Sequence, residues 1–245
     1  MKAERKKRAR ESMLALKDMF DFMYPGDKGT EELRRLLIGY GSPSAMIEAG
    51  MNRLKYEGMS EENAMLVAIL PDIVRHMEAV SHGKHPKINS LLAAEKYLKH
   101  RYIGRNVENF HLLSLDKNGR LIECVHLHTG DEDSVPFYLK SVMSEVVRTR
   151  AEAIVLCHNH PSGTIRPSGA DIECTRRLLR AVAHIGAPLI DHVIMVGGHA
   201  LSIRGFGFIQ ESEWISQAPE SRLMKGWLAG WDMEAAADTL KSISK

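Results

Sequence analysis

The feature of the sequence that most limits its fold is a change of hydrophobic pattern near residue 85. From Thr30 to Val80 the apolar residues recur at helical spacing, which predicts several short helices. Beyond a polar stretch with Gly and Pro, short apolar runs of strand length alternate with helical segments. This change excludes both an all-helical and an all-β chain. The sequence therefore predicts an N-terminal all-helical domain followed by an α/β domain with a mixed sheet flanked by helices.

The boundaries follow from the same pattern. We expect a helical domain over residues 1–80, a linker over residues 81–89, the α/β domain over residues 90–212 and a helical C-terminal tail over residues 213–245. Pro71 is expected to end or kink the last helix of the first domain.

Five strands are expected in the α/β domain. The first two are joined by Asn118-Gly119, a dipeptide typical of tight hairpin turns. The third, over residues 153–157, is apolar throughout and is therefore expected to be buried on both faces. The other expected strands cover residues 110–115, 121–127, 189–196 and 200–203.

The composition of the sequence indicates the compartment in which the protein is expected. The sequence has no apolar run of the roughly 18 residues that a membrane span requires, and its basic start leads into no secretory signal. Three cysteines argue against a disulfide framework, so we expect a cytoplasmic protein. The net charge of +2 is too small to imply a nucleic-acid partner by itself, but residues 2–10 contain six Lys or Arg and one Glu. That arm is either simply solvated or a weak contact for nucleic acid.

One segment carries metal-binding chemistry. His158 and His160 follow a buried strand, and residues i and i+2 of an extended chain point to the same side. Pro161 and Gly163 break the strand, and Asp171 lies in the first turn of the next helix. Two imidazole nitrogens and one carboxylate, with a fourth position left to water, are typical of a catalytic zinc site.

Each part of this pattern has an ordinary interpretation. Ser168 and Asp171 form the spacing of a helix capping box, and histidines two residues apart are commonly surface residues. Cys157 should point to the opposite face of the strand, and Cys174 either fills the core or approaches the metal. The combination of all three candidate ligands nevertheless favours the metal site.

The motif resembles the metal motif of the JAB/MPN metallo-isopeptidases, often called JAMM. The longer run His-Asn-His-Pro-Ser-Gly over 158–163, followed by Pro-Ser-Gly-Ala-Asp-Ile over 167–172, is similar to the bacterial RadC branch. The resemblance extends over roughly residues 90–205. It implies a JAB/MPN-like, cytidine-deaminase-like fold preceded by a helical domain similar to a helix-hairpin-helix. In this chain that hairpin is degenerate, because only Gly58 remains of its glycine turn.

The resemblance also implies roles for site residues. It implies Zn²⁺ on His158, His160 and Asp171, with Glu108 handling the proton of the zinc-activated water. Ser168 would donate its hydroxyl to the oxyanion of the tetrahedral intermediate. Glu123 and Glu145 are weaker candidates for the base.

The function that the sequence favours is a zinc-dependent metallopeptidase or isopeptidase that cleaves an amide bond of a protein or peptide. A zinc nucleoside deaminase is disfavoured, because no Pro-Cys-x-x-Cys follows the histidines. Two alternatives stay open. One is a DNA-associated protein of repair or recombination with a structural metal. The other is an interaction scaffold whose site has lapsed.

Overall fold

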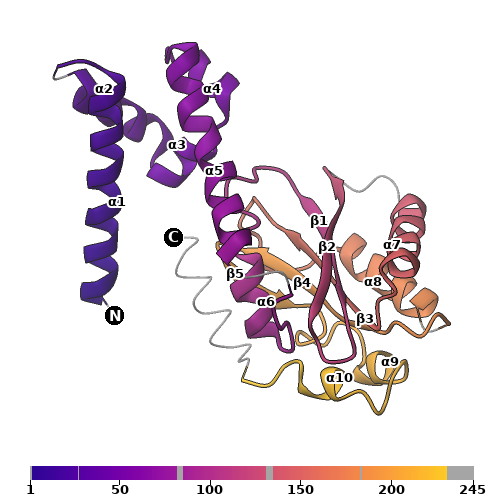
Figure 1. Cartoon of the computed structure of the whole chain (residues 1–245). Helices are drawn as coiled ribbons and strands as arrows, with labels where there is room; N and C mark the ends of the chain where they lie inside the picture. The colour runs from indigo at the N-terminus through magenta and orange to yellow at the C-terminus, as the bar shows by residue number, and fades with distance from the viewer. Residues whose placement is uncertain (1, 27, 82–84, 131–134, 183, 231–245) are drawn as a thin grey trace. The chain divides into compact units, whose positions relative to one another are not determined.

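The computed structural model describes residues 2–26, 28–81, 85–130, 135–182 and 184–230 (Figure 1). Contacts between residues divide the chain into two compact units, Met1–Val74 and Arg75–Lys245.

The first unit is helical. Its core brings together buried apolar residues from five helices, as the helical spacing of the sequence predicts. Gly29 allows α1 and α2 to approach, because a Cβ atom there would lie 2.6 Å from the carbonyl oxygen of Phe20. Helix α5 runs through Pro71 as one helix, so the proline does not end it. The helices are α1 (Lys2–Met23), α2 (Lys28–Tyr40), α3 (Pro43–Glu48), α4 (Met51–Tyr56) and α5 (Glu61–Ser81), whose last residues belong to the second unit.

The second unit is built on a five-stranded sheet of order β2-β1-β3-β4-β5. Only β3 and β4 are parallel, and every other neighbouring pair is antiparallel. The hairpin turn between β1 and β2 has Gly119 at φ +72°, and Asp116 Oδ1 accepts the backbone N–H groups of Asn118 and Arg120. The strands are β1 (Asn109–Leu115), β2 (Leu121–Thr129), β3 (Ala153–Asn159), β4 (Leu189–Val196) and β5 (His199–Ser202).

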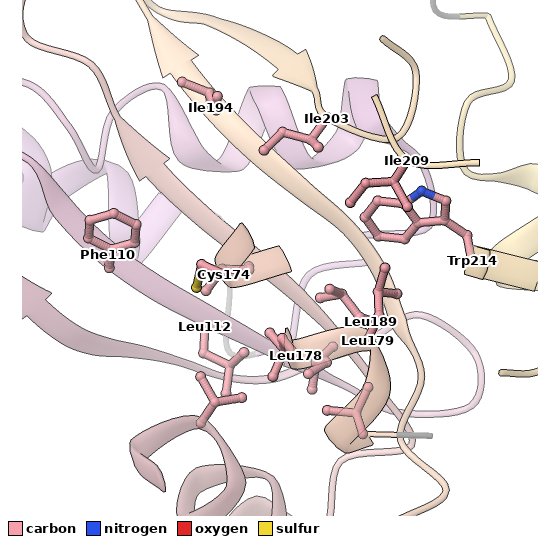
Figure 2. Close-up of a cluster of buried hydrophobic side chains, with 14 of the residues drawn as sticks. Phe110, Leu112, Cys174, Leu178, Leu179, Leu189, Ile194, Ile203, Ile209 and Trp214 are labelled. Carbon is pink, nitrogen blue, oxygen red and sulfur yellow. The ribbon is translucent and has the colours of Figure 1, made fainter. Parts of the chain in front are cut away.

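Helices cover both faces of this sheet, which makes three layers (Figure 1). Helices α7 (Val135–Thr149) and α8 (Gly169–Val182) pack on one face, where Phe110, Leu112, Leu178 and Trp214 share one core (Figure 2). Helix α6 (Leu91–Leu98) packs on the other face. The mixed α/β class predicted from the sequence is confirmed.

The C-terminal segment contributes to both cores. Short helices α9 (Glu211–Ile215) and α10 (Arg222–Gly226) bring the fully buried Trp214 and Trp227 against the sheet. Trp227 Nε1 donates to Asp191 Oδ2 at 2.8 Å, which ties the segment to the centre of β4. Trp231 and the rest of the predicted helical tail lie outside the described residues.

Among the helices that the structure describes, none combines the length and the hydropathy of a membrane span.

Candidate metal centre

The two histidines lie where the end of β3 runs beside β4. Phe110 pairs with His158 across the sheet, and His160 continues the ladder by donating its N–H to the carbonyl of Met195 at 3.0 Å. Because the backbone is extended, both imidazoles fall on the same side, and their Nε2 atoms lie 3.0 Å apart. Both side chains are buried.

Asp171 reaches the histidines through a helix cap. The backbone N–H of Ser168 donates to Asp171 Oδ2 at 2.6 Å, and the N–H of Asp171 donates to Ser168 Oγ at 3.0 Å. This capping box holds Asp171 Oδ1 at 3.1 Å from His158 Nε2 and Oδ2 at 3.6 Å from His160 Nε2. The ordinary interpretation of the Ser168–Asp171 spacing is thus correct, and the same box aims the carboxylate at the histidines.

The donor atoms fit a zinc ion. His158, His160 and Asp171 form the one group of potential ligands within 4.8 Å of one another among the described residues. Three ligands of a tetrahedral zinc ion, at bonds of about 2.0–2.1 Å, lie about 3.3 Å apart, close to the separations here. Zinc would be held by the Nε2 atoms of His158 and His160 and by the carboxylate of Asp171.

Electrostatics follow from burial and hydrogen bonding. Burial raises the pKa of Asp171, but hydrogen bonds from His158 and His160 outweigh it and hold that pKa well below its usual range. Burial lowers the pKa of His160, whereas hydrogen bonds to Asp171 and to the carbonyl of Thr164 raise it, and the net direction is upward. A carboxylate that stays ionised suits a cation.

Glu108 lies beside the three candidate ligands. Its Oε1 is 3.9 Å from His160 Nε2, and its side chain is 30% exposed. Its backbone is held where β1 begins, since its carbonyl accepts the N–H of Gly130 at 2.9 Å. Glu123 and Glu145, the weaker candidates for the base, both pair with Arg148.

Asn159, between the two histidines, points to the other side and fastens the segment that carries Glu108. Its Oδ1 accepts the N–H of Asn109 at 2.9 Å, and its Nδ2 donates to the carbonyl of Val107 at 3.1 Å. Reasoning from the sequence missed this role. The sequence shows only that Asn159 stands between the two histidines, so its side chain is expected on the opposite side of the strand.

His192 and Thr175 were also missed. His158 Nδ1 lies 2.9 Å from His192 Nε2, and His192 Nδ1 lies 2.7 Å from Thr175 Oγ1. Burial and the neighbouring His158 lower the pKa of His192 well below its usual value, so this imidazole is neutral. The available signal was a histidine inside the apolar run of residues 189–196. Its partner, His158, lies 34 residues earlier on another strand, so the sequence does not indicate the contact.

Neither Cys157 nor Cys174 belongs to the group of candidate ligands. Cys157 faces the opposite core and contacts the carbonyl of His111, and burial raises the pKa of its thiol. Cys174, a residue of α8, is packed in the core on the sheet face that α7 and α8 cover, as the interpretation of a small apolar side chain predicts (Figure 2).

Comparison with known proteins agrees with this architecture. The family model described as the RadC-like JAB domain matches residues 88–208. A UPF0758 protein of Chromobacterium violaceum is 31% identical over 192 residues, which cover 77% of this chain and 86% of the relative. One of Pseudomonas fluorescens is 33% identical over 193 residues, covering 75% and 83%. One of Shewanella denitrificans is 43% identical over 99 residues, covering 40% and 44%.

The family match spans the whole sheet together with the three candidate ligands, and the first two relatives extend the similarity over three quarters of the chain. The resemblance seen in the sequence motif is therefore confirmed, and the chain belongs to the RadC family, with a RadC-like JAB domain.

Proposed function

We propose that this chain is a zinc-dependent hydrolase of amide bonds, acting on a protein or peptide as a metallopeptidase or isopeptidase. The observation that carries the proposal is the group of His158, His160 and Asp171 with Glu108 3.9 Å from one of them. Structural zinc sites normally have four protein ligands, whereas catalytic sites keep one position open. Three ligands with a neighbouring carboxylate therefore favour catalysis over a structural role.

The chain's own residues supply the proton transfers. A bound zinc ion would supply a Lewis acid that lowers the pKa of water and polarises a carbonyl. Glu108 Oε1 takes a proton from the attacking water and returns it to the leaving amine nitrogen. Ser168 Oγ already accepts the N–H of Asp171, and its own O–H donates to the substrate oxygen as negative charge develops there.

Glu108→Gln tests the proposal, with Glu123→Gln as the control. Glu123 is an exposed carboxylate on β2 paired with Arg148, so its amide variant changes charge equally without touching the site. Both variants should keep about one zinc per chain by plasma mass spectrometry. Cleavage of a panel of peptide and isopeptide-linked substrates should fall about 100- to 10,000-fold in Glu108→Gln only. Equal cleavage by both variants would contradict the role of Glu108, and a wild type that holds no zinc after reconstitution would favour an interaction scaffold.

A contact with nucleic acid is the second candidate, and the six basic residues within positions 2–10 favour it. Such a contact depends on phosphate neutralisation and weakens steeply with salt. A salt-dependent mobility shift of duplex DNA that is lost on deletion of residues 1–10 would support it. Binding that the deletion leaves unchanged would exclude this arm.

A further inference from the structure

A buried chain of hydrogen bonds leads away from His158 and returns to a ligand residue. It runs from His158 Nδ1 to His192 Nε2 over 2.9 Å, and from His192 Nδ1 to Thr175 Oγ1 over 2.7 Å. Thr175 Oγ1 then donates to the backbone carbonyl of Asp171 over 2.6 Å. His158, His192 and Thr175 are fully buried, so water does not compete for these bonds.

The two candidate histidine ligands differ in what holds their second nitrogen. His160 Nδ1 lies 2.8 Å from the carbonyl of Thr164, which only accepts. In the neutral imidazole, which is the form that binds a metal, the proton of His160 is therefore held on Nδ1 and Nε2 keeps its lone pair. His158 instead meets another imidazole, and a neutral imidazole donates through one nitrogen and accepts through the other. This contact alone does not decide which nitrogen of His158 carries the proton.

The other end of this hydrogen-bond network decides which nitrogen of His158 carries the proton. The carbonyl of Asp171 can only accept a hydrogen bond, so the hydroxyl of Thr175 donates its one proton to that carbonyl. Thr175 Oγ1 must therefore accept from His192 Nδ1–H. His192 Nε2 then has a lone pair and accepts from His158 Nδ1–H. In the opposite order, Thr175 Oγ1 and the Asp171 oxygen would face each other at 2.6 Å with no proton between them. One order satisfies all three bonds of this network, and it leaves His158 Nε2 with a lone pair. That lone pair faces His160 Nε2 at 3.0 Å and Asp171 Oδ1 at 3.1 Å, so a cation between the three atoms would satisfy all of them.

We propose that His192 and Thr175 are positioning residues that set the tautomer of His158, so that its Nε2 presents a lone pair beside His160 and Asp171. The inference rests on the proposed zinc site for its consequence, since only a nitrogen with a free lone pair binds a metal. The three bonds of the network are made by atoms other than the candidate ligand atoms, so they can form with or without the ion. Without Thr175 Oγ1, His192 loses its acceptor and the proton of His158 is free to move to Nε2.

Thr175→Val tests the inference, and Thr149→Val is the matched control. Both threonines lie on helices that cover the same sheet face, and both donate Oγ1–H to the carbonyl four residues earlier, at 2.6 Å and 2.7 Å. Thr149 Oγ1 also lies 3.0 Å from Ser114 Oγ and 3.5 Å from the carbonyl of Val146, and neither residue is a candidate ligand. Valine keeps the shape of threonine, and any loss of stability common to both variants is measured by thermal unfolding.

The first readout is zinc affinity, measured by competition with a chromophoric chelator. We expect Thr175→Val to bind zinc about 10- to 100-fold more weakly than wild type, the range found for residues that orient metal-bound histidines. Thr149→Val should match wild type, and Thr175→Ser, which restores the hydroxyl, should recover the affinity. Equal affinities in Thr175→Val and wild type would overturn the inference.

The second readout needs neither zinc nor a stable variant. Long-range ¹H–¹⁵N spectra of histidine-labelled, metal-free wild type at pH 8 report which ring nitrogen is protonated. We expect His158 to be the Nδ1–H form, and finding it as the Nε2–H form would overturn the inference. A wild type that binds no zinc but shows His158 Nδ1–H would refute the proposed function and leave the positioning role standing.

Discussion

Asp171→Asn separates the two roles of the Asp171 carboxylate, which caps α8 and faces the histidines. An asparagine has the same shape, and its side-chain oxygen can still accept the N–H of Ser168 that Asp171 Oδ2 accepts at 2.6 Å. Its amide nitrogen can donate to His158 Nε2 in place of the carboxylate contact at 3.1 Å. The variant should therefore fold like the wild type and lose only its negative charge toward the metal.

The size of the effect follows from linkage between binding and folding. At free zinc about 1,000 times the dissociation constant, binding stabilises the folded state by about 4.1 kcal/mol. For a domain of roughly 150–250 residues each kcal/mol moves Tm by about 2–4 °C, so zinc should raise the Tm of wild type by about 8–16 °C. In Asp171→Asn the same zinc concentration should change Tm by less than about 3 °C, since two neutral ligands hold zinc weakly.

Asp171→Ala provides the structural comparison. It removes the cap as well as the charge, and loss of a capping side chain costs about 1 kcal/mol. In the absence of zinc at pH 8, Asp171→Ala should thus unfold about 2–4 °C below Asp171→Asn, with neither responding to zinc. The assay is differential scanning calorimetry with and without zinc, together with zinc content by plasma mass spectrometry. A zinc-dependent rise of Tm in Asp171→Asn equal to that of wild type would refute the assignment of Asp171 as a ligand.

Three further variants test other parts of the structure. His160→Ala should purify with no zinc, and unchanged zinc content by mass spectrometry would contradict its role as a ligand. Trp227→Phe removes the bond to Asp191 and should lower the free energy of unfolding in urea by about 1.5–3 kcal/mol, whereas a loss below about 0.5 kcal/mol would show that the bond is not important. Burial, and then the nearby Arg101, lower the pKa of His111 to about 3. As the pH falls below about 6.5, the imidazole of His111 is protonated in the unfolded chain but not in the folded protein, so the free energy of unfolding decreases. Between pH 7.5 and 5 wild type should lose about 2 kcal/mol more than His111→Phe, and parallel pH curves from urea unfolding would contradict this pKa.

Local features of the sequence predict much of the sheet. The hairpin follows from Asn118-Gly119, and the buried third strand follows from its continuous apolar run. These predictions succeed because turn geometry and strand patterning depend on residues close together in the chain. Pro71 shows the limit. Of the two outcomes expected there, an end of the helix or a kink, the first does not occur, because α5 continues to Ser81.

The candidate site, too, has a part that depends only on residues close together in the chain. His158 and His160 face one point because an extended strand repeats every two residues, and Asp171 is aimed by a box that spans four residues. These three candidate ligands, and the zinc chemistry that they favour, were therefore predictable from the sequence by itself.

Only the tertiary structure decides what surrounds them. His192 meets His158 because β3 and β4 are parallel neighbours, and the crossover between them brings together residues 34 positions apart. Glu108 lies beside His160 because Asn159 fastens the start of β1 to the end of β3. The pairing of β3 with β4 and of β1 with β3 joins strands that are distant in the sequence, and no local pattern identifies which strands become neighbours. The sequence determined which atoms could hold a metal, whereas the fold decided which groups set their tautomers and which carboxylate stands beside them.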